Sequence, residues 1–413
     1  MVMRKITLLF IFGFPACISA NSSMNEFLLS AQTDVNEPTP SDSNGAGMSV
    51  ASTWLEEAQF RFNTTEGNDF DAKERAQSYE IRVKPKAWGQ REIEESILDL
   101  RLNQQNNNYN LALNAALKKR YLILLAYLKQ YNITQYLFNL ADLSTQEVGL
   151  IRSDGLTNQF NPENLFDSME MSEQSKGLAA LNLVRLNALQ TQIGMPLDTA
   201  DSVLHTSAVA NIVDFVNMSD QIITLTNTLQ PAPEVQDKRL ALEMVQAKSK
   251  LIKAERQFGV NLLSFTYKES RNDNMNFQVG VNLPLGTHFS RAESQYKVSK
   301  AQTHLENHIV IIKQSLISLE KEIAWLKGEV KLADMQILRV QKYLATEPVK
   351  VHALLTVNLS KELIEHKRKR NDIHLKALEL YLDSLALSGL LIQHPLRNWM
   401  QKGTPELVSG ERG

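Results

Sequence analysis

The stretch Phe277–Gln302 joins an alternating strand to a very long helix. At its start apolar and polar residues alternate, and this period of two places them on opposite faces of a strand. Pro284 ends that strand because proline donates no ladder hydrogen bond. Ser290 then stands three residues before Glu293, the spacing of a capping box, and the helix that follows contains no proline. So long a helix fed by a short amphipathic strand is unusual in a globular domain.

The same order occurs earlier in the chain. YEIRVKPKAWG (Tyr79–Gly89) is the counterpart of FQVGVNLPLG (Phe277–Gly286), about two hundred residues apart. Each closes a predicted hairpin, Gln59–Lys86 in the first half and Asn261–Leu285 in the second. In the first hairpin the strand around Phe60 is predicted to be short. The spacing indicates a duplicated half rather than a solenoid unit.

Each hairpin is followed by a long helix and a returning helix. The pairs are Gln90–Arg152 with Glu163–Ile193, and His288–Leu344 with Val351–Leu391. At 1.5 Å per residue the two outgoing helices are ~95 Å and ~85 Å long. Helices of this length need neighbours along their whole course, from the other repeat and from other subunits. An Asn-rich segment, Asn103–Asn110, interrupts the apolar stripe of the first one.

The remaining segments complete a predicted domain plan. We expect a short helix at Val50–Ala58 and another at Glu234–Phe258. The predicted units are a signal peptide (1–20), a flexible leader (21–49), a first repeat (50–196), a linking helical region (197–257), a second repeat (258–395) and a loose tail (396–413).

Residues 1–20 have the pattern of an export signal. Arg4 and Lys5 precede an apolar core that is too short to span a bilayer, and Ala20 is an acceptable cleavage site. Cys17 is the only cysteine of the chain. It is either removed with the signal or lipidated, and the weak sequence before it favours removal. No later stretch reaches ~18 uninterrupted apolar residues, so a membrane crossing would have to use strands.

Composition excludes several classes of function. Lys and Arg number 44 against 46 Asp and Glu, so the chain has no basic field for nucleic acid. No phosphate loop, GxSxG motif or cysteine nucleophile occurs, and we expect neither an enzyme nor a cofactor. His304 and His308 lie one turn apart, but the spacing is not HExxH, and an interhelical or solvated pair is favoured over a metal site. The basic run His366–Arg370 is predicted to be a solvated face near the acids of other helices.

The LPLG junction, the polar helix after it and the doubled layout over Trp54–His394 resemble the outer-membrane efflux (TolC-like) family. The resemblance implies a mainly α fold with a small β part. Long antiparallel helical hairpins would form an α-barrel of coiled coils, and β-hairpins would form a shared outer-membrane β-barrel. It also implies a homotrimer, because two hairpins alone leave open sheet edges that a bilayer does not tolerate.

The resemblance assigns faces and a gate. The lipid-facing strand residues would be Leu263, Phe265, Tyr267, Phe277, Val279, Val281 and Leu283. In the family, two apolar residues and an Asp mark the returning helix at the periplasmic gate. Leu165-Phe166-Asp167 matches this, whereas Thr356 replaces the acid in the second half. The implied entrance is therefore an acidic ring of Asp154, Glu163, Asp167 and Glu170 that favours cations, although acids also suit a helix N-terminus.

The implied function is a passive exit duct in the outer membrane of a Gram-negative bacterium, with its helices in the periplasm. Its partners would be outer-membrane lipid, a periplasmic adaptor and an inner-membrane transporter of RND or ABC type, in efflux or type I secretion. One alternative from another class stays open, a periplasmic structural coiled-coil protein without a pore. A metal-binding role for His304 and His308 is a third, weaker alternative.

Overall fold

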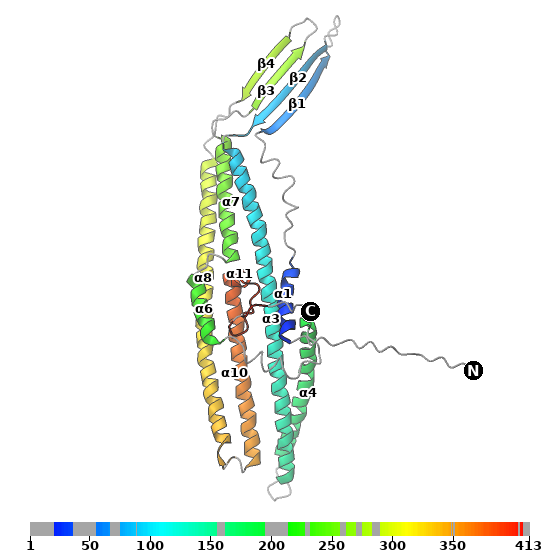
Figure 1. Cartoon of the computed structure of the whole chain (residues 1–413), viewed down its shortest axis with the longest axis vertical. Coiled ribbons are helices and arrows are strands. Elements are labelled where there is room, and N and C mark those ends of the chain that lie inside the picture. The colour runs from blue at the N-terminus through cyan, green and yellow to red at the C-terminus, as the bar shows by residue number, and fades with distance from the viewer. Residues whose placement is uncertain are drawn as a thin grey trace, which may run out of the picture.

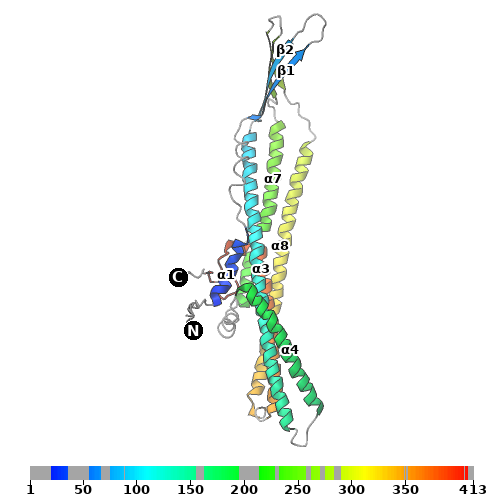
Figure 2. The ribbon, with the colours of Figure 1, turned by 90° about the vertical axis from the view of Figure 1, so that its right-hand side faces the viewer.

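The computed structural model shows an elongated rod with a β-sheet at one end (Figure 1). It describes residues 20–35, 55–66, 75–87, 89–154, 162–194, 214–227, 232–256, 262–269, 275–282, 290–347, 349, 352–403 and 405–407. The described residues around 154, 162, 344 and 353 lie at the opposite end, which we call the distal end. Figure 2 shows the same narrow outline from the side.

The sheet combines both predicted hairpins. Strands β1 (Leu55–Glu66), β2 (Arg75–Pro85), β3 (Leu262–Glu269) and β4 (Met275–Asn282) are antiparallel in the order β1-β2-β3-β4. The helix expected at Val50–Ala58 is wrong for residues 55–58, which begin β1, and the first strand is 12 residues long rather than short. Pairing with β2 along its whole length overrides the local helix preference of Leu55–Ala58.

Five helices build the rod. They are α3 (Gln90–Asp154), α4 (Pro162–Ile193), α7 (Pro233–Arg256), α8 (Ser290–Leu344) and α10 (Ala353–Ser388). Helices α3 and α8 are the longest, and α4 and α10 return beside them over the distal half (Figure 1). Helix α7 lies against α3 and α8 in the half near the sheet, in line with α10. The rod therefore keeps its thickness although no returning helix spans its length.

The Asn-rich segment does not interrupt α3, which continues through it as one helix. The buried Asn107 side chain donates a hydrogen bond to the carbonyl of Pro233, at the start of α7, over 3.0 Å. About two turns further on, the Asn114 side chain donates to the carbonyl of Ala386 in the last turn of α10 over 2.8 Å. These amides therefore bind the backbone where two shorter helices meet.

Short elements surround the middle of the rod: α1 (Ala20–Thr33), α6 (Phe215–Asn227) and α11 (Leu390–Gln393). The prediction of a flexible leader is wrong for α1, because Leu28 and Ala31 are fully buried and the Arg120 guanidinium lies 4.5 Å from the Phe27 ring centroid. The other residues of the leader, 36–49, and the signal segment before Ala20 lie outside the described residues.

The C-terminal tail is also ordered where the structure describes it. Trp399, Met400 and Leu407 are buried in the central core. The Tyr121 hydroxyl donates to the Arg397 carbonyl over 2.8 Å and accepts from the Trp399 backbone N–H over 3.3 Å. The predicted loose tail is therefore wrong up to Leu407, because its few apolar residues pack against α3.

Asn107 provides a test of the helix junction. Asn107→Ala leaves the Pro233 carbonyl without its partner in a buried setting, and we expect a loss of ~1–3 kcal/mol in stability. Asn106→Ala, at an exposed neighbouring position, is the control and should change stability by less than about 0.5 kcal/mol. Thermal unfolding of the purified protein, followed by circular dichroism, measures both. Equal midpoints for the two variants would contradict the junction role.

Candidate functional site

The distal half is made of two coiled-coil pairs. On α4 the buried residues Ser168, Ser172, Ser175 and Ala179 recur at intervals of four, three and four. This is the seam spacing of a coiled coil, and small side chains at the seam let α4 approach α3 closely. The Thr145 and Ser172 hydroxyls lie 3.0 Å apart across this seam. On α8 the seam residues are larger; those buried are Ile312, Leu316, Ile323, Leu326, Ala333, Ile337 and Val340.

The four predicted entrance acids all belong to the distal end of the first pair. Asp154 is the last residue of α3, and Glu163 lies in the first turn of α4. Asp167 and Glu170 follow on α4 and are exposed, as is Glu163. The turn between α8 and α10 lies at the same end (Figure 1). The structure thus brings the four positions to one end of the rod, and their arrangement as a ring stays a prediction.

Thr356 binds backbone carbonyl groups between α8 and α10. Its hydroxyl lies 2.9 Å from the Val349 carbonyl and 3.2 Å from the His352 carbonyl, and it can donate to either. It therefore closes the α8–α10 turn by binding backbone acceptors, which a carboxylate could not do. The family pattern showed that Thr356 stands where an acid is expected, but it did not predict these hydrogen bonds.

The two helical pairs meet along a contact between α10 and α3 that changes character along its length. Near the middle of the rod the residues of α10 are buried and apolar: Leu375, Leu378, Leu382 and Leu385. Toward the distal end the same face carries polar groups. We call this part the polar seam; it consists of Lys361, Glu365, Arg368, Asn371 and Asp372 on α10 with Asn132, Tyr136 and Glu147 on α3.

Direct contacts hold the polar seam together. The Lys361 ammonium pairs with the Glu147 carboxylate, and the two side chains are only 15% and 13% exposed. The Arg368 guanidinium lies 4.7 Å from the Tyr136 ring centroid, a cation–π contact. Asn132 donates to Asp372 over 2.9 Å and accepts from Asn371 over 3.1 Å.

Burial and charge shift the pKa values in the seam. Burial, with the Glu365 carboxylate beside it, raises the pKa of Tyr136 to about 12. The hydrogen bond from Arg368 lowers the pKa of Glu365, whereas burial raises the pKa of Asp372. In the polar seam, Lys361 and Arg368 are bound by the carboxylates of Glu147 and Glu365. In the central part of the same contact, leucine side chains pack instead. The periodicity of α10 revealed the helix but not which partner would face these charges.

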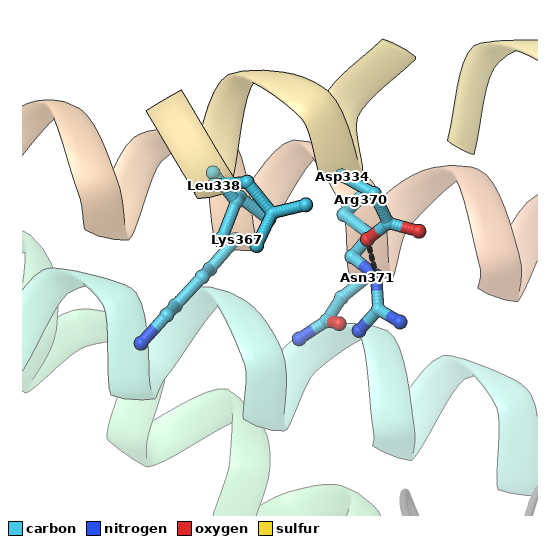
Figure 3. A pocket seen from close by; sticks show the side chains of 6 residues that line it. Asp334, Leu338, Lys367, Arg370 and Asn371 are labelled. Atoms are coloured by element: carbon cyan, nitrogen blue, oxygen red, sulfur yellow. Dashed lines mark ion pairs between the residues drawn. The ribbon is translucent and has the colours of Figure 1, made fainter. Parts of the chain in front are cut away.

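The basic run His366–Arg370 borders an open hollow of about 560 Å³ between α8 and α10 (Figure 3). Arg370 pairs with Asp334 of α8 over 2.6 Å, which confirms the prediction that part of this run lies near an acid of another helix. The Lys367 side chain extends away from that pair in Figure 3. The lining residues are Asp334, Ile337, Leu338, Lys367, Arg370 and Asn371.

The histidine pair forms one interhelical contact. His308 of α8 lies 3.3 Å from the Glu234 carboxylate at the start of α7, as the prediction of an interhelical pair requires. Within the described ranges, no group of three or more His, Cys, Asp or Glu side chains is placed to hold a metal ion. A search of the same residues finds no helix of the length and apolarity needed to cross a membrane.

The predicted lipid-facing strand residues share one face of the sheet. Phe277, Val279, Val281 and Phe265 are 76%, 64%, 53% and 48% exposed. Leu263 and Tyr267 on the same face are half-buried by their neighbours, and Leu283 lies outside the described residues. Of the strand residues that the structure describes, none belongs to the central core, so the described part of this face does not pack against the rod. Its contact with lipid stays a prediction at this point.

No protein-family model matches the sequence, and no curated protein matches it either. Solved structures do match. VceC, an outer membrane protein from Vibrio cholerae, superposes with a TM-score of 0.62 at 12% identity, over 89% of this chain and 96% of that one. CusC, described in terms of transmembrane channel formation, gives 0.56 at 14% identity over 89% and 92%.

The Campylobacter jejuni CmeC outer membrane channel gives a TM-score of 0.54 at 9% identity, over 93% of this chain and 87% of that chain. All three comparisons cover the sheet, the rod and the central elements together, because each spans nearly the whole of both chains. The architecture that the LPLG junction and the doubled layout predicted is thereby confirmed. The chain has the fold of the TolC-like outer membrane factors.

Proposed function

We propose that this chain is one subunit of a trimeric exit duct in the outer membrane of a Gram-negative bacterium. The duct passively conducts substrates to the exterior from a periplasmic adaptor and an inner-membrane pump of RND or ABC type, in efflux or type I secretion. One observation carries the proposal. A sheet with an exposed apolar face and two unpaired edges stands at the end of a helical rod.

The sheet edges require other subunits. Within the part of the chain that the structure describes, strands β1 and β4 each pair on one side only, so the other side of each presents the backbone groups of an open sheet edge. In a bilayer such groups cost several kcal/mol each, and only a closed barrel satisfies them. Three copies of a four-stranded sheet give twelve strands, an even number within the range of bacterial barrels.

The helices point to the same assembly. On α4 and α8, large apolar side chains stay 60–67% exposed in the single chain: Leu181, Val184, Trp325 and Leu338. Exposed apolar groups along a rod this narrow indicate contact with further copies. A ring of such rods encloses a passage that continues the barrel into the periplasm.

The distal end supplies the gate in this proposal. The polar seam joins the two helical pairs of one subunit through ion pairs and hydrogen bonds rather than a leucine core. The acids Asp154, Glu163, Asp167 and Glu170 then surround the opening and favour cations. The proposed duct is passive, so the energy for transport comes from the inner-membrane pump.

The alternative is a periplasmic coiled-coil protein whose sheet packs on a protein partner. Fractionation and gel behaviour distinguish the two. A duct is recovered with outer membranes as a detergent-dependent trimer whose mobility changes on heating, whereas the alternative is a soluble periplasmic species.

A first test joins the sheet edges of neighbouring subunits. Gln59→Cys on β1 and Gln278→Cys on β4 are three strand spacings apart within a chain, at least ~14 Å, so a short bismaleimide links them chiefly between chains. We expect a ladder on denaturing gels that ends at a cross-linked trimer. Each single-cysteine variant is a control and should give no trimer. A ladder that stops at a dimer would contradict threefold closure.

A second test addresses the polar seam. Lys361→Met leaves the Glu147 carboxylate buried without its cation, which we expect to destabilise the seam by about 3 kcal/mol and to increase single-channel conductance. Adding Glu147→Gln should recover much of both effects, since no unpaired charge remains. Lys369→Met, at an exposed position, is the matched control. Planar-bilayer conductance equal to that of the unmodified protein would argue against a gate at this seam.

A third test addresses the acidic opening. Asp167→Ala removes one carboxylate per subunit, three per ring, and we expect lower cation selectivity, read from the reversal potential across a salt gradient. Asp142→Ala removes an exposed carboxylate of α3 away from the turn and should leave selectivity unchanged. An unaltered reversal potential in Asp167→Ala would remove this residue from the pore.

A further inference from the structure

The side of the sheet opposite the apolar face carries more basic than acidic residues. Successive side chains of a strand point to opposite faces, so the sequence neighbours of the exposed apolar residues lie on this side. The strand register aligns them in three rows: Gln59, Arg82, Ser264 and Gly280; Arg61, Glu80, Thr266 and Gln278; and Asn63, Ser78, Lys268 and Asn276. We call these residues the basic patch. Three of them are cationic, one is acidic and the others are uncharged.

The row that follows toward the helices has a different charge. Glu57 faces Lys84 there, and Lys84 pairs with Glu56 over 2.7 Å. This row therefore adds two carboxylates and one ammonium group. Glu57 and Arg61 are four residues apart, ~14 Å along the strand, so this acid does not pair with Arg61. The positive charge thus belongs to the part of the polar side nearer the hairpin tips, and the polar side with this row included still has one cation in excess.

A single carboxylate serves the two arginines of the basic patch. Glu80 faces Arg61 in the register, but its carboxylate pairs with Arg82 over 2.7 Å. Arg61 instead donates to the neutral amide oxygen of Gln59 over 3.0 Å. Lys268 is exposed and, among the described residues, forms no ion pair. Three cations and one carboxylate leave two positive charges per subunit, or six in the proposed trimer.

This excess is not needed to keep the face in water. Uncharged polar residues such as Thr266, Gln278 and Asn276 already make the wall compatible with water, and they carry no net charge. A strand face with evenly paired charges would also be neutral. The exposed cations Arg61 and Lys268, which no carboxylate of the patch pairs with, are therefore the feature that carries the inference.

In the proposed barrel the polar side lines the passage, because the apolar side contacts lipid. Twelve strands ~4.8 Å apart and tilted by ~40° enclose a backbone radius of ~12 Å. An extended arginine or lysine side chain reaches ~6 Å from its backbone, which puts its charge ~6 Å from the axis. The Debye length is ~10 Å in 0.1 M salt and ~3 Å in 1 M salt. These charges therefore act across the whole passage at physiological salt and are screened at 1 M.

We propose that the basic patch makes the barrel segment of the passage favour anions, so that the duct accepts substrates that carry an anionic group. Rings of charged side chains select ions by sign in other channels. The inference rests on the proposed duct and names a charge class for what passes through it. The two ends of the passage then have opposite preferences, because the acids of the distal opening favour cations.

The experiment measures the block of open channels by a polyanion. The full chain is reconstituted in a planar bilayer in 0.1 M KCl, and mellitate, a benzene ring with six carboxylates, is added to both sides. We expect mellitate to reduce the single-channel current of the unmodified protein, and the block to disappear in 1 M KCl because the charges are then screened. A block measurement is preferred to a reversal potential, because the reversal potential combines the preferences of both ends.

Three variants locate the block in the basic patch. Arg61→Gln with Lys268→Gln removes both unpaired cations and should weaken mellitate binding about tenfold or more. Glu80→Gln releases Arg82 from its only carboxylate and should strengthen binding. Glu80→Gln combined with Arg82→Gln removes one charge of each sign from the same face. It is the matched control, and we expect its block to stay within about twofold of the unmodified protein.

Failure of this inference and failure of the duct give different results. Channels that mellitate does not block in 0.1 M KCl overturn the inference and leave the duct intact. So does a block that is equally strong in the unmodified protein and in Arg61→Gln with Lys268→Gln. A chain that forms no channels in the bilayer and no heat-modifiable trimer overturns the proposed duct itself.

Discussion

The unpaired backbone groups at the edges of the sheet are the constraint on which the rest of the structure depends. Among the described residues, strands β1 and β4 have no neighbour on one side, and the sheet stands clear of the helical rod. An open edge is tolerated in water but not in hydrocarbon. In the proposed duct, closure by further copies also sets the spacing of the rods below the sheet. Each helix must then be long and straight enough to meet a neighbour throughout its course.

The helices of the rod are held together by two kinds of contact. Where helices must stay fixed, near its middle, Tyr121 and the leucines of α10 are buried with α1 and the C-terminal segment around them. Toward the distal end, ion pairs and amide hydrogen bonds replace leucine. When a buried ion pair separates, water hydrates both charges again, and this offsets part of the lost attraction. Such a contact therefore resists opening less than an apolar core of the same area. In the proposed duct, the centre of the rod stays fixed and the distal end is the part that separates.

Sequence patterns predicted the repeated elements because their periodicity is long. Helices α3 and α8 were each placed within two residues at both ends, and both hairpins were found from alternation alone. The failures concern short elements that tertiary contacts decide. Helix α1 has few apolar residues, yet Leu28 and Ala31 become fully buried against α3. Asn107 was read as an interruption because a buried amide and an exposed one look alike until a carbonyl is placed beside it.

In the candidate site, too, the sequence predicted the positions that depend on neighbours in the chain but not the contacts between distant segments. Asp167 was assigned to the distal end because it matches the family's gate pattern, and the structure places it there near the start of α4. Its role in a gate stays a prediction. The polar seam was missed because its partners, such as Lys361 and Glu147, are far apart in sequence and meet only when two helical pairs pack. A heptad register gives one clue: Lys361, Arg368 and Leu375 recur every seven residues on α10. Charged residues at successive seam positions, followed by leucine, indicate a contact that is polar toward the distal end and apolar near the middle of the rod.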